Sequence, residues 1–333
     1  MGNFTFKGLF LAGLFMVLGC LSIQAADDDG LITEQVTVKM YKAGILLDKI
    51  GANKKFKITN LKIIGKINGT DFRVIREMAG NDAWGNKTDG MLSVLDLSDA
   101  KIVKGGDYYY NYHTHFGSLS CYTSNDKIGD HAFRGCSGLT SLTLPSGVTE
   151  IGEGAFRGCS GLTSLTLPSG LTKIGNEAFE DCIGLTSLTL PSGVTWIGSS
   201  AFKGCIGLTS LTFPFSVTFL GGSAFKDCSG LTSIYVYTEK LPETGVNVFN
   251  GCDAKKCTVY VPKGTYDDYW LSEFGYFENI VEFDPTGINN VITSNDAKEL
   301  SRYSLNGQRL SAPTKGLNIV KYSDGSVKKV VVQ

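Results

Sequence analysis

The chain has no excess charge of either sign, few histidines and no long hydrophobic run beyond its first residues. Its 31 Lys and Arg residues balance 32 Asp and Glu residues and are scattered, so it lacks the basic patch of a nucleic-acid-binding protein. Three histidines leave few candidates for catalytic constellations. With 42% hydrophobic and only 19% charged residues, however, the chain of 333 residues is too apolar for disorder, and we expect it to fold.

The first 25 residues are typical of an export signal. An apolar run from Gly8 to Gly19 follows the single charge of Lys7 and is too short to span a membrane, and no second hydrophobic segment of spanning length follows. Two processing sites stay open. Ordinary cleavage would fall near Ala25, whereas residues 17–20 resemble a bacterial lipobox in which Cys20 carries the lipid. Both predict an exported protein, either on the outer membrane surface or secreted.

A repeat of 23 residues occupies the middle of the chain. Each unit opens with Leu-x-x-Leu-x-Leu, whose alternation predicts a short strand with one buried face. A Pro ends the strand in most units, a Gly permits a turn, and an Ala-Phe-x-x-Cys segment follows. The period is carried by Phe133, Phe156, Phe179, Phe202 and Phe225, and by Cys136, Cys159, Cys182, Cys205 and Cys228.

Each unit is therefore predicted to form one coil of a β-rich solenoid. A lone coil buries too little apolar surface to offset the entropy of ordering it, so neighbouring coils must cover both of its open sides. Relaxing the strict period extends the array to about nine parallel strands, and the wider first gap predicts a short helix that begins with a capping Asp71. The expected central strand residues are Leu61, Leu95, Leu119, Leu142, Leu165, Leu188, Leu211, Ile234 and Val259.

The composition divides the chain into four parts. We expect a signal peptide at residues 1–25, an N-terminal cap at 26–57, the solenoid with its closing cap at 58–283, and a linker with a small all-β domain at 284–333. Two hairpin signals, Asn306–Gly307 and Asp324–Gly325, support the last part. The alternative is that these hairpins dock on the end of the solenoid.

The cysteines and histidines have structural explanations. Thiols that recur at one inward position are expected to form a stacked core column rather than disulfides, and Cys252 and Cys257, which break the period, are the candidate bridged pair. His113 and His115 lack the further ligands that zinc requires. No catalytic constellation, phosphate loop or Gly-x-Ser-x-Gly elbow occurs, so we expect no enzyme, no metal and no cofactor.

The repeat also resembles a known family. The unit from Gly138 to Cys159 is similar to the BspA-type leucine-rich repeats of surface proteins from anaerobic Gram-negative bacteria, and residues 116–252 match the motif nearly throughout. Residues 257–283 resemble the closing cap of that family, and residues 303–332 resemble short C-terminal β domains that in some relatives act in sorting or attachment. The resemblance implies a non-enzymatic surface or secreted protein, some of whose relatives bind host matrix proteins or other cells.

Outward strand residues form two hydroxyl ladders that are candidates for a binding surface. Solenoids bind partners on extended faces, but Ser and Thr are also simply soluble strand residues that hydrogen-bond along a ladder. Uniform hydroxyls discriminate poorly between partners, so aromatic residues at the ends of the array are better candidates for anchors. The candidates are Ser164, Thr166, Ser187, Thr189, Ser210 and Thr212 in the ladders, with Tyr235 and Tyr237 at their edge.

A second aromatic cluster, Tyr108, Tyr109, Tyr110 and Tyr112, precedes the strict repeats and either grips a protein or sugar or packs on its own cap. The sequence thus predicts adhesion to, or recognition of, a protein or glycan partner at the cell surface, with host matrix among the candidates. The alternative is a structural or assembly component of the envelope without a diffusible ligand. We expect no nucleic-acid partner, and membrane contact only through a lipid at Cys20.

Overall fold

The computed structural model describes residues 30–114, 117–238, 240–284, 299–304, 309–313, 315–322 and 327–332. The predicted signal peptide and Cys20 lie outside these residues. Within them, none of the helices combines the length and the apolar character that crossing a membrane requires.

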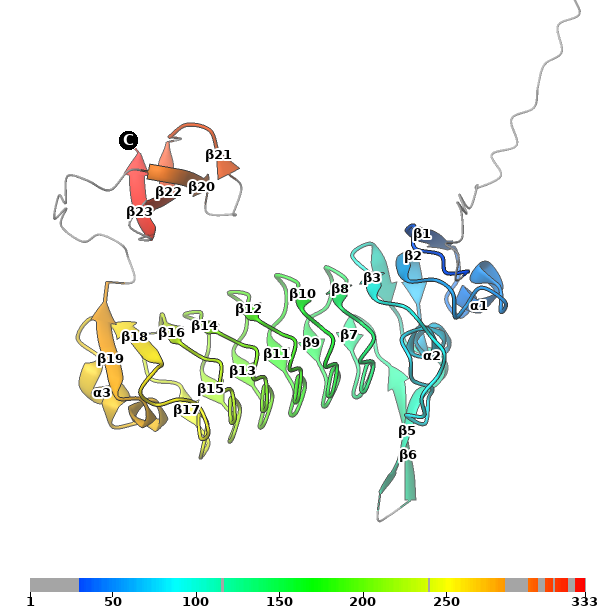
Figure 1. Cartoon of the computed structure of the whole chain (residues 1–333), viewed down its shortest axis with the longest axis horizontal. Helices are drawn as coiled ribbons and strands as arrows, with labels where there is room; N and C mark the ends of the chain where they lie inside the picture. The colour runs from blue at the N-terminus through cyan, green and yellow to red at the C-terminus, as the bar shows by residue number, and fades with distance from the viewer. Residues whose placement is uncertain are drawn as a thin grey trace, which may run out of the picture.

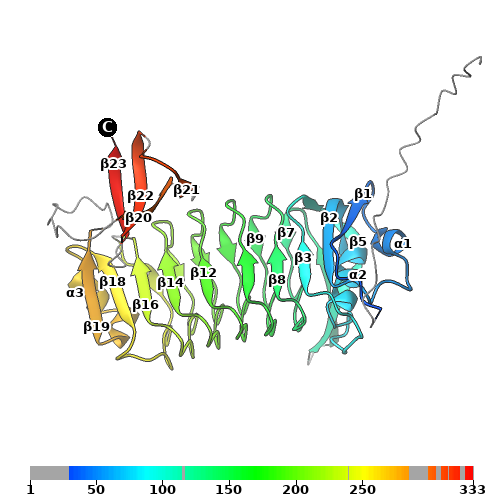
Figure 2. The same ribbon diagram turned by 45° about the horizontal axis from the view of Figure 1, so that its top comes forward.

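Each 23-residue unit forms one coil, and the coils stand side by side in a row (Figure 1). One side of each coil carries a parallel strand with its central residue pointing inward, so that Leu142 lies opposite Leu165 and Leu188 opposite Leu211. Figure 2 shows these strands aligned along the array. The predicted leucine-rich solenoid is therefore confirmed. The strands of this first side are β1 (Val36–Met40), β2 (Asn60–Ile67), β3 (Val94–Asp96), β8 (Ser141–Thr143), β10 (Ser164–Thr166), β12 (Ser187–Thr189), β14 (Ser210–Phe213), β16 (Ser233–Val236), β18 (Thr258–Pro262) and β19 (Asn279–Phe283).

The other side of the coils carries a second parallel sheet of six two-residue strands. Its inward residues, such as Ile151, Ile174 and Ile197, are fully buried, while the preceding residue of each strand faces outward. The strands of this second side are β7 (Lys127–Ile128), β9 (Glu150–Ile151), β11 (Lys173–Ile174), β13 (Trp196–Ile197), β15 (Phe219–Leu220) and β17 (Glu243–Thr244).

Two columns of side chains fill the interior. The repeated phenylalanines, extended by Phe249, stack with ring centroids 5.0–6.0 Å apart and nearly parallel planes. The cysteines form the predicted core column, and from Cys159 onward each Sγ donates to the carbonyl of the Phe in the preceding coil at 3.0–3.3 Å. Cys252 belongs to this column, and Cys252 and Cys257 are buried free thiols. The thiols therefore pack as small apolar groups and also satisfy buried carbonyls.

The predicted rung at Leu119 is wrong. Strand β3 pairs directly with β8, with Leu95 opposite Leu142, and Leu119 instead lies opposite Tyr112 in an antiparallel hairpin. The 47-residue interval between Leu95 and Leu142 is close to two periods, which is why its middle resembled another rung. The hairpin of β5 (Gly105–Thr114) and β6 (Gly117–Thr123) projects from the array (Figure 1), and β4 (Ala100–Ile102) pairs with β2.

The first-side strands form two sheets rather than one. The pairings run from β1 to β10 and again from β12 to β19, with no pairing between β10 and β12 within the described residues. Leu165 in β10 is half-buried, whereas Leu142 and Leu211 are buried. On the second side, β9, β11 and β13 remain paired, so the coils stay joined there.

The N-terminal cap contains α1 (Leu46–Ile50) and α2 (Gly69–Met78) beside β1 and β2. The predicted helix is confirmed, but Asn68 is its N-cap residue, and Asp71 completes a capping box by accepting from Asn68 N at 3.0 Å. The buried Asp71 carboxylate also accepts from Gly44 N at 2.6 Å and Leu46 N at 3.0 Å, so it fixes α1 against α2. Phe72 of α2 packs against Phe133 of the first coil at 5.7 Å.

Along the wall that carries the repeated Phe, the hydrogen bonds between coils run in one direction. Each N–H of a repeated Phe donates to a carbonyl of the following coil at 2.7–2.9 Å, as Phe156 N does to Ala178 O. The first coil therefore presents unmatched carbonyls. Arg76 and Tyr109 replace the missing coil there, because Arg76 donates to Ala132 O at 3.1 Å and Arg134 O at 3.2 Å, and the Tyr109 hydroxyl donates to Asp130 O at 2.8 Å.

The closing cap consists of α3 (Tyr266–Trp270) and the 3-10 helix η1 (Glu273–Tyr276), which lie beyond the last coil between β18 and β19. Phe274 packs against Phe249 at the end of the phenylalanine column, with their ring centroids 5.1 Å apart. The Glu273 carboxylate accepts from Val248 N at 3.0 Å. The cap thus covers the apolar end of the column.

The C-terminal segment forms a separate antiparallel sheet in the order β21–β20–β22–β23. Buried Arg302 donates to Asn318 Oδ1 at 3.2 Å beside the buried Val320. Both predicted hairpin dipeptides lie outside the described residues. The strands are β20 (Glu299–Ser304), β21 (Arg309–Leu310), β22 (Gly316–Tyr322) and β23 (Val327–Val332).

Candidate recognition surfaces

The hydroxyl ladders lie on the outer face of the first side, where the sequence placed them. Ser187 is in register with Ser210 and Ser233, and Thr189 with Thr212 and Tyr235. Ser233 Oγ donates to Ser210 Oγ at 3.1 Å. This bond is what we expect if the hydroxyls serve only as soluble strand residues that hydrogen-bond along a ladder. Ser164, Thr166, Ser187 and Thr189 are exposed on either side of the gap between β10 and β12. These residues form a polar face that is interrupted at the middle of the array.

Toward its C-terminal end this face becomes aromatic. Tyr235 and Tyr260 are in register on β16 and β18, and their rings stack with centroids 4.5 Å apart and planes 6° apart. The ring of Phe283 makes edge contacts with Tyr235 at 6.4 Å and Tyr237 at 5.3 Å. Phe215, which is 64% exposed, packs against Tyr237 at 5.6 Å. We call these five residues the C-terminal aromatic surface.

The hydroxyls of Tyr235 and Tyr237 on this surface remain protonated at physiological pH. Burial raises the pKa of Tyr235, with the neighbouring Tyr260 adding to the effect, and burial also raises the pKa of Tyr237. A protonated phenol is both a donor and an acceptor, next to an apolar ring. The surface therefore combines apolar area with hydrogen-bonding groups, which is typical of anchor residues in interfaces.

The sequence identified Tyr235 and Tyr237 but missed Tyr260, Phe215 and Phe283. Tyr260 was within reach, because it follows the rung residue Val259 as Tyr235 follows Ile234, and so alternation points it outward. Phe283 lies on the added strand β19, which is outside the strict repeat, and Phe215 lies in the turn after β14. Neither residue has a counterpart at the same position in neighbouring units.

The structure divides the tyrosine cluster at the N-terminal end. Tyr109 and Tyr110 are buried, Tyr109 bonding Asp130 O and Tyr110 lying beneath the Arg76 guanidinium at 4.5 Å. These two residues pack on the N-terminal cap, which was one of the two predictions for the cluster, and cannot face a partner. Tyr108 and Tyr112 are partly exposed, and Tyr112 packs against Tyr110 and His131.

Trp84, which the sequence analysis missed, joins Tyr108 at this end. It lies in a tight loop between α2 and β3, and its indole is 46% exposed and contacts the rings of Tyr108 and His113, each at 6.1 Å. Tyr122 of β6 extends the group through Tyr108 at 6.5 Å. We call Trp84, Tyr108, His113 and Tyr122 the N-terminal aromatic surface. Because the loop lies outside the repeats, no spacing signal marked Trp84.

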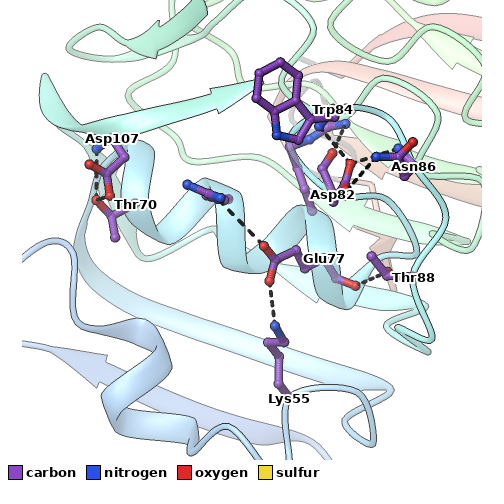
Figure 3. Close-up of polar contacts among 10 residues, drawn as sticks. Lys55, Thr70, Glu77, Asp82, Trp84, Asn86, Thr88 and Asp107 are labelled. Carbon is purple, nitrogen blue, oxygen red and sulfur yellow. Dashed lines mark hydrogen bonds and ion pairs between the residues drawn. The ribbon is translucent and has the colours of Figure 1, made fainter. Parts of the chain in front are cut away.

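One carboxylate accepts three hydrogen bonds within the Trp84 loop (Figure 3). Asp82 Oδ1 accepts from Trp84 N and Asn86 N, each at 2.8 Å, and Oδ2 accepts from Asn86 Nδ2 at 3.0 Å. Partial burial alone would raise the pKa of Asp82, but the hydrogen bonds from Asn86 and Trp84 outweigh it and the pKa is lowered. A fixed loop presents the indole without the entropy loss of ordering it on binding.

The buried cysteine thiols are poor nucleophiles. Burial raises the pKa of the Cys205 and Cys252 thiols to about 12, so both stay protonated and poorly nucleophilic. Ser118 Oγ is hydrogen-bonded to His113 Nδ1 at 2.8 Å, and His115 lies outside the described residues. Among the residues that the structure describes, no cluster of three His, Cys, Asp or Glu side chains could hold a metal ion.

Comparisons with known proteins agree with the repeat. A family model described as the BspA type leucine rich repeat region matches in six copies, within residues 104–232 and 149–269. None of the curated proteins is similar enough to the chain to count as a match.

Three solved structures illustrate the relatives. The T. pallidum leucine rich repeat protein TpLRR is 37% identical over 34% of this chain and 52% of its own, with a TM-score of 0.33. A leucine rich cell surface protein from Faecalibacterium prausnitzii is 25% identical over 62% of this chain and 49% of its own, with a TM-score of 0.34. The pneumococcal vaccine antigen PcpA is 18% identical over 68% of this chain and 57% of its own, with a TM-score of 0.40. The chain thus spans about half the length of the first two.

Proposed function

Because the repeat region of this chain belongs to the BspA-type leucine-rich repeat family, we propose that the protein is an exported recognition protein that binds a protein or glycan partner at the cell surface. Repeats of this family typically act as non-enzymatic binding scaffolds in interaction or surface roles. Adhesion, with host matrix proteins among the partners, is the specific form of that role. The protein reaches the surface after processing near Ala25 or at Cys20.

The observation that carries the proposal is the stacked pair of Tyr235 and Tyr260. In the units before them the same outward position holds Thr189 and Thr212, so the ladder changes from hydroxyl to aromatic only near the closing cap. Folding does not require this change, because threonine serves at the same position of equivalent coils. Both tyrosines are partly exposed, and tyrosines with polar tips concentrate binding energy in interfaces.

Two substitutions test the role of this surface. Tyr235→Thr and Tyr260→Thr restore the residue of the earlier units, so the coil should keep its stability. We expect the double variant to lose about 30-fold or more in affinity, the effect of removing one or two anchor residues. Saturable binding is measured first for the unmodified chain on a panel of host matrix proteins and on a glycan array.

The matched control is Trp196→Lys on the second side, where Lys173 holds the same position one coil earlier. Binding that survives Tyr235→Thr with Tyr260→Thr but is lost in the control would contradict the assigned surface. A chain that binds nothing on either panel would favour the alternative, a structural component of the envelope. Binding to only one panel identifies the partner as protein or glycan.

A further inference from the structure

The projecting hairpin has one open strand edge. Strands β5 and β6 form a two-stranded sheet of their own, and within the described residues β6 pairs with no other strand. The hairpin projects from the array (Figure 1), and residues 117–120 of β6 are all exposed. An unpaired and exposed edge of this kind is where a further strand can add to a sheet.

The register identifies the backbone groups on that edge. Asn111 of β5 lies opposite Ser120 of β6, and Asn111 N donates to Ala83 O at 2.7 Å, so its N–H points away from β6. Asn111 and Ser120 are therefore a non-hydrogen-bonded pair, and the N–H and C=O of Ser120 point away from β5. Because the pattern alternates every two residues, the N–H and C=O of Ser118 point the same way. Within the described residues, neither serine N–H donates to a turn or loop.

The outer edge of β5 is already in use. The hydrogen bond from Asn111 N to Ala83 O ties the middle of β5 to the loop that carries Trp84. Nearer its start, Asp107 N donates to Thr70 Oγ1 of α2 at 3.0 Å. The hairpin therefore offers the edge of β6, rather than that of β5, to a further strand.

The hairpin lacks the features that block pairing between identical edges. Residues 108–123 include no Lys, Arg, Asp, Glu or Pro. Natural proteins protect exposed edges with charged residues, especially Lys, and with Pro. Two copies of β6 can therefore approach each other without charge repulsion, and the strand has no charge with which to select an acidic or a basic partner.

An antiparallel copy of β6 is complementary to this edge. When a two-fold axis passes at Leu119, Ser118 of each copy faces Ser120 of the other, and each such pair exchanges two N–H to C=O hydrogen bonds. Leu119, which is 52% exposed, then lies opposite its own counterpart in a close, non-hydrogen-bonded pair. This register satisfies the open backbone groups of both serines and covers the apolar side chain between them.

We propose that two copies of the chain associate through β6 in this register and form a four-stranded sheet in the order β5–β6–β6–β5. The assembly closes as a symmetric dimer, because the outer edge that remains on each side is that of β5. Since the shared edge is short, the dimer is a weak one. It does not depend on the function proposed above, and it leaves the C-terminal aromatic surface free.

Sedimentation velocity of the full chain over a concentration series tests the association. We expect the dimer fraction to rise with concentration up to the submillimolar range, as for a small interface. Amide hydrogen exchange at both ends of the series locates the contact. Ser118 N and Ser120 N should exchange at least about fivefold more slowly at the high concentration, while Asn111 N, which is already hydrogen-bonded, should not change. A chain that stays monomeric throughout, or a dimer that leaves both serine amides unprotected, would overturn the proposal.

Opposite charges placed at Leu119 test the position of the axis. Leu119→Lys and Leu119→Glu should each raise the dissociation constant by about tenfold or more, because like charges then face each other. An equimolar mixture of the two variants should form a heterodimer at a concentration where neither variant dimerises alone. Leu271→Lys and Leu271→Glu, which alter an exposed leucine of the closing cap, are the control pair and should leave the association unchanged. A mixture that stays monomeric would overturn the proposed register.

A thiol at the same position provides a covalent test. Side chains of a close, non-hydrogen-bonded pair lie within the range that a disulfide bridges. On mild oxidation, Leu119→Cys should therefore accumulate covalent dimer at least about tenfold faster than Leu271→Cys, in which the introduced thiol is also exposed. Equal rates for the two variants would contradict a dimer centred on Leu119.

Discussion

The two ends of the solenoid are closed by opposite chemistry. At the N-terminal end the exposed groups are carbonyls, and a cation and a phenol donate to them. At the C-terminal end they are N–H groups, and the Glu273 carboxylate accepts from the neighbouring Val248 N. The difference follows from the single direction of the hydrogen bonds along the wall of the repeated Phe, so the two caps of such an array cannot be interchanged. Side chains satisfy the carbonyls at the first end, and the closing cap covers the phenylalanine column at the other.

Arg76 is suited to the N-terminal end because its guanidinium is planar with several donors. It is fully buried and reaches four carbonyls, those of Asp82, His131, Ala132 and Arg134, at 3.0–3.2 Å. The Tyr110 ring beneath it compensates part of the buried charge. A lysine, with a single ammonium group, could not reach this set of acceptors in one plane.

We expect the largest loss of stability from a substitution in the phenylalanine column between the two caps. Phe179 stacks between Phe156 and Phe202 at 5.0 Å on each side. Phe179→Ala should lower the free energy of unfolding by about 4 kcal/mol through lost burial and a cavity. Urea denaturation measures this value, with the exposed Phe215→Ala as the control expected to change it by less than about 0.5 kcal/mol. Equal midpoints for the two variants would contradict the inward column.

The N-terminal cap should give the next largest effect. Arg76→Met keeps the length of the side chain but removes one donor from each of four buried or partly buried carbonyls, and Ala132 O and Arg134 O lose the donor that replaces the missing coil, so we expect a loss of about 3 kcal/mol. Arg73→Met, at a half-buried arginine of the same helix that pairs with Glu77, is the control. A denaturation midpoint that does not move would show that water replaces the guanidinium and that the end needs no cationic cap.

Acid should also weaken this end selectively. Burial, with the positive charges of Arg134 and Arg76 adding to it, lowers the pKa of His131 from 6.5 to about 4. Between those values the unfolded chain binds a proton that the folded chain does not, so stability falls as pH drops from 6.5 toward 4, by about 2 kcal/mol in total. His131→Asn, which suits the positive φ of 56°, should flatten this slope in denaturation series measured at several pH values.

We expect the smallest loss of stability from a substitution in the closing cap. Glu273→Ala removes the acceptor of Val248 N and should cost about 1 kcal/mol, less than Arg76→Met, because one hydrogen bond is lost rather than four. Glu278→Ala, an exposed neighbour, is the control for the lost charge. If Glu273→Ala destabilised more than Arg76→Met, the ranking of the two ends would be reversed.

The sequence predicted the middle of the molecule far better than its ends. A coil repeats because each of its neighbours needs the same side chain at the same place, which is why Phe179 and Cys182 could be assigned to columns from spacing alone. A terminal coil has only one neighbouring coil, and residues from outside the repeat take the place of the other. Arg76, Tyr109 and Glu273 therefore have no periodic signal.

The same reasoning explains what was missed among the candidate surfaces. Alternation points Tyr235 outward, and the same rule would have found Tyr260 on the next rung. Trp84 depends on a loop that is organised by the Asp82 carboxylate, and only three-dimensional contacts reveal it. The false rung at Leu119 shows the limit of spacing, since an antiparallel hairpin of nearly the right length satisfies the same pattern.

The gap between β10 and β12 divides the array into two blocks with different mechanical coupling. In a linear array each coil is stabilised by its neighbours, so the junction with the fewest backbone bonds is where cooperativity is weakest. The coils there remain joined by the pairing of β11 with β13 and by the N–H groups of Glu177, Phe179 and Asp181, which donate to the following coil. Force applied along the array, as on a protein tethered at one end and bound to a partner at the other, would therefore separate the blocks at this junction before either block unravels.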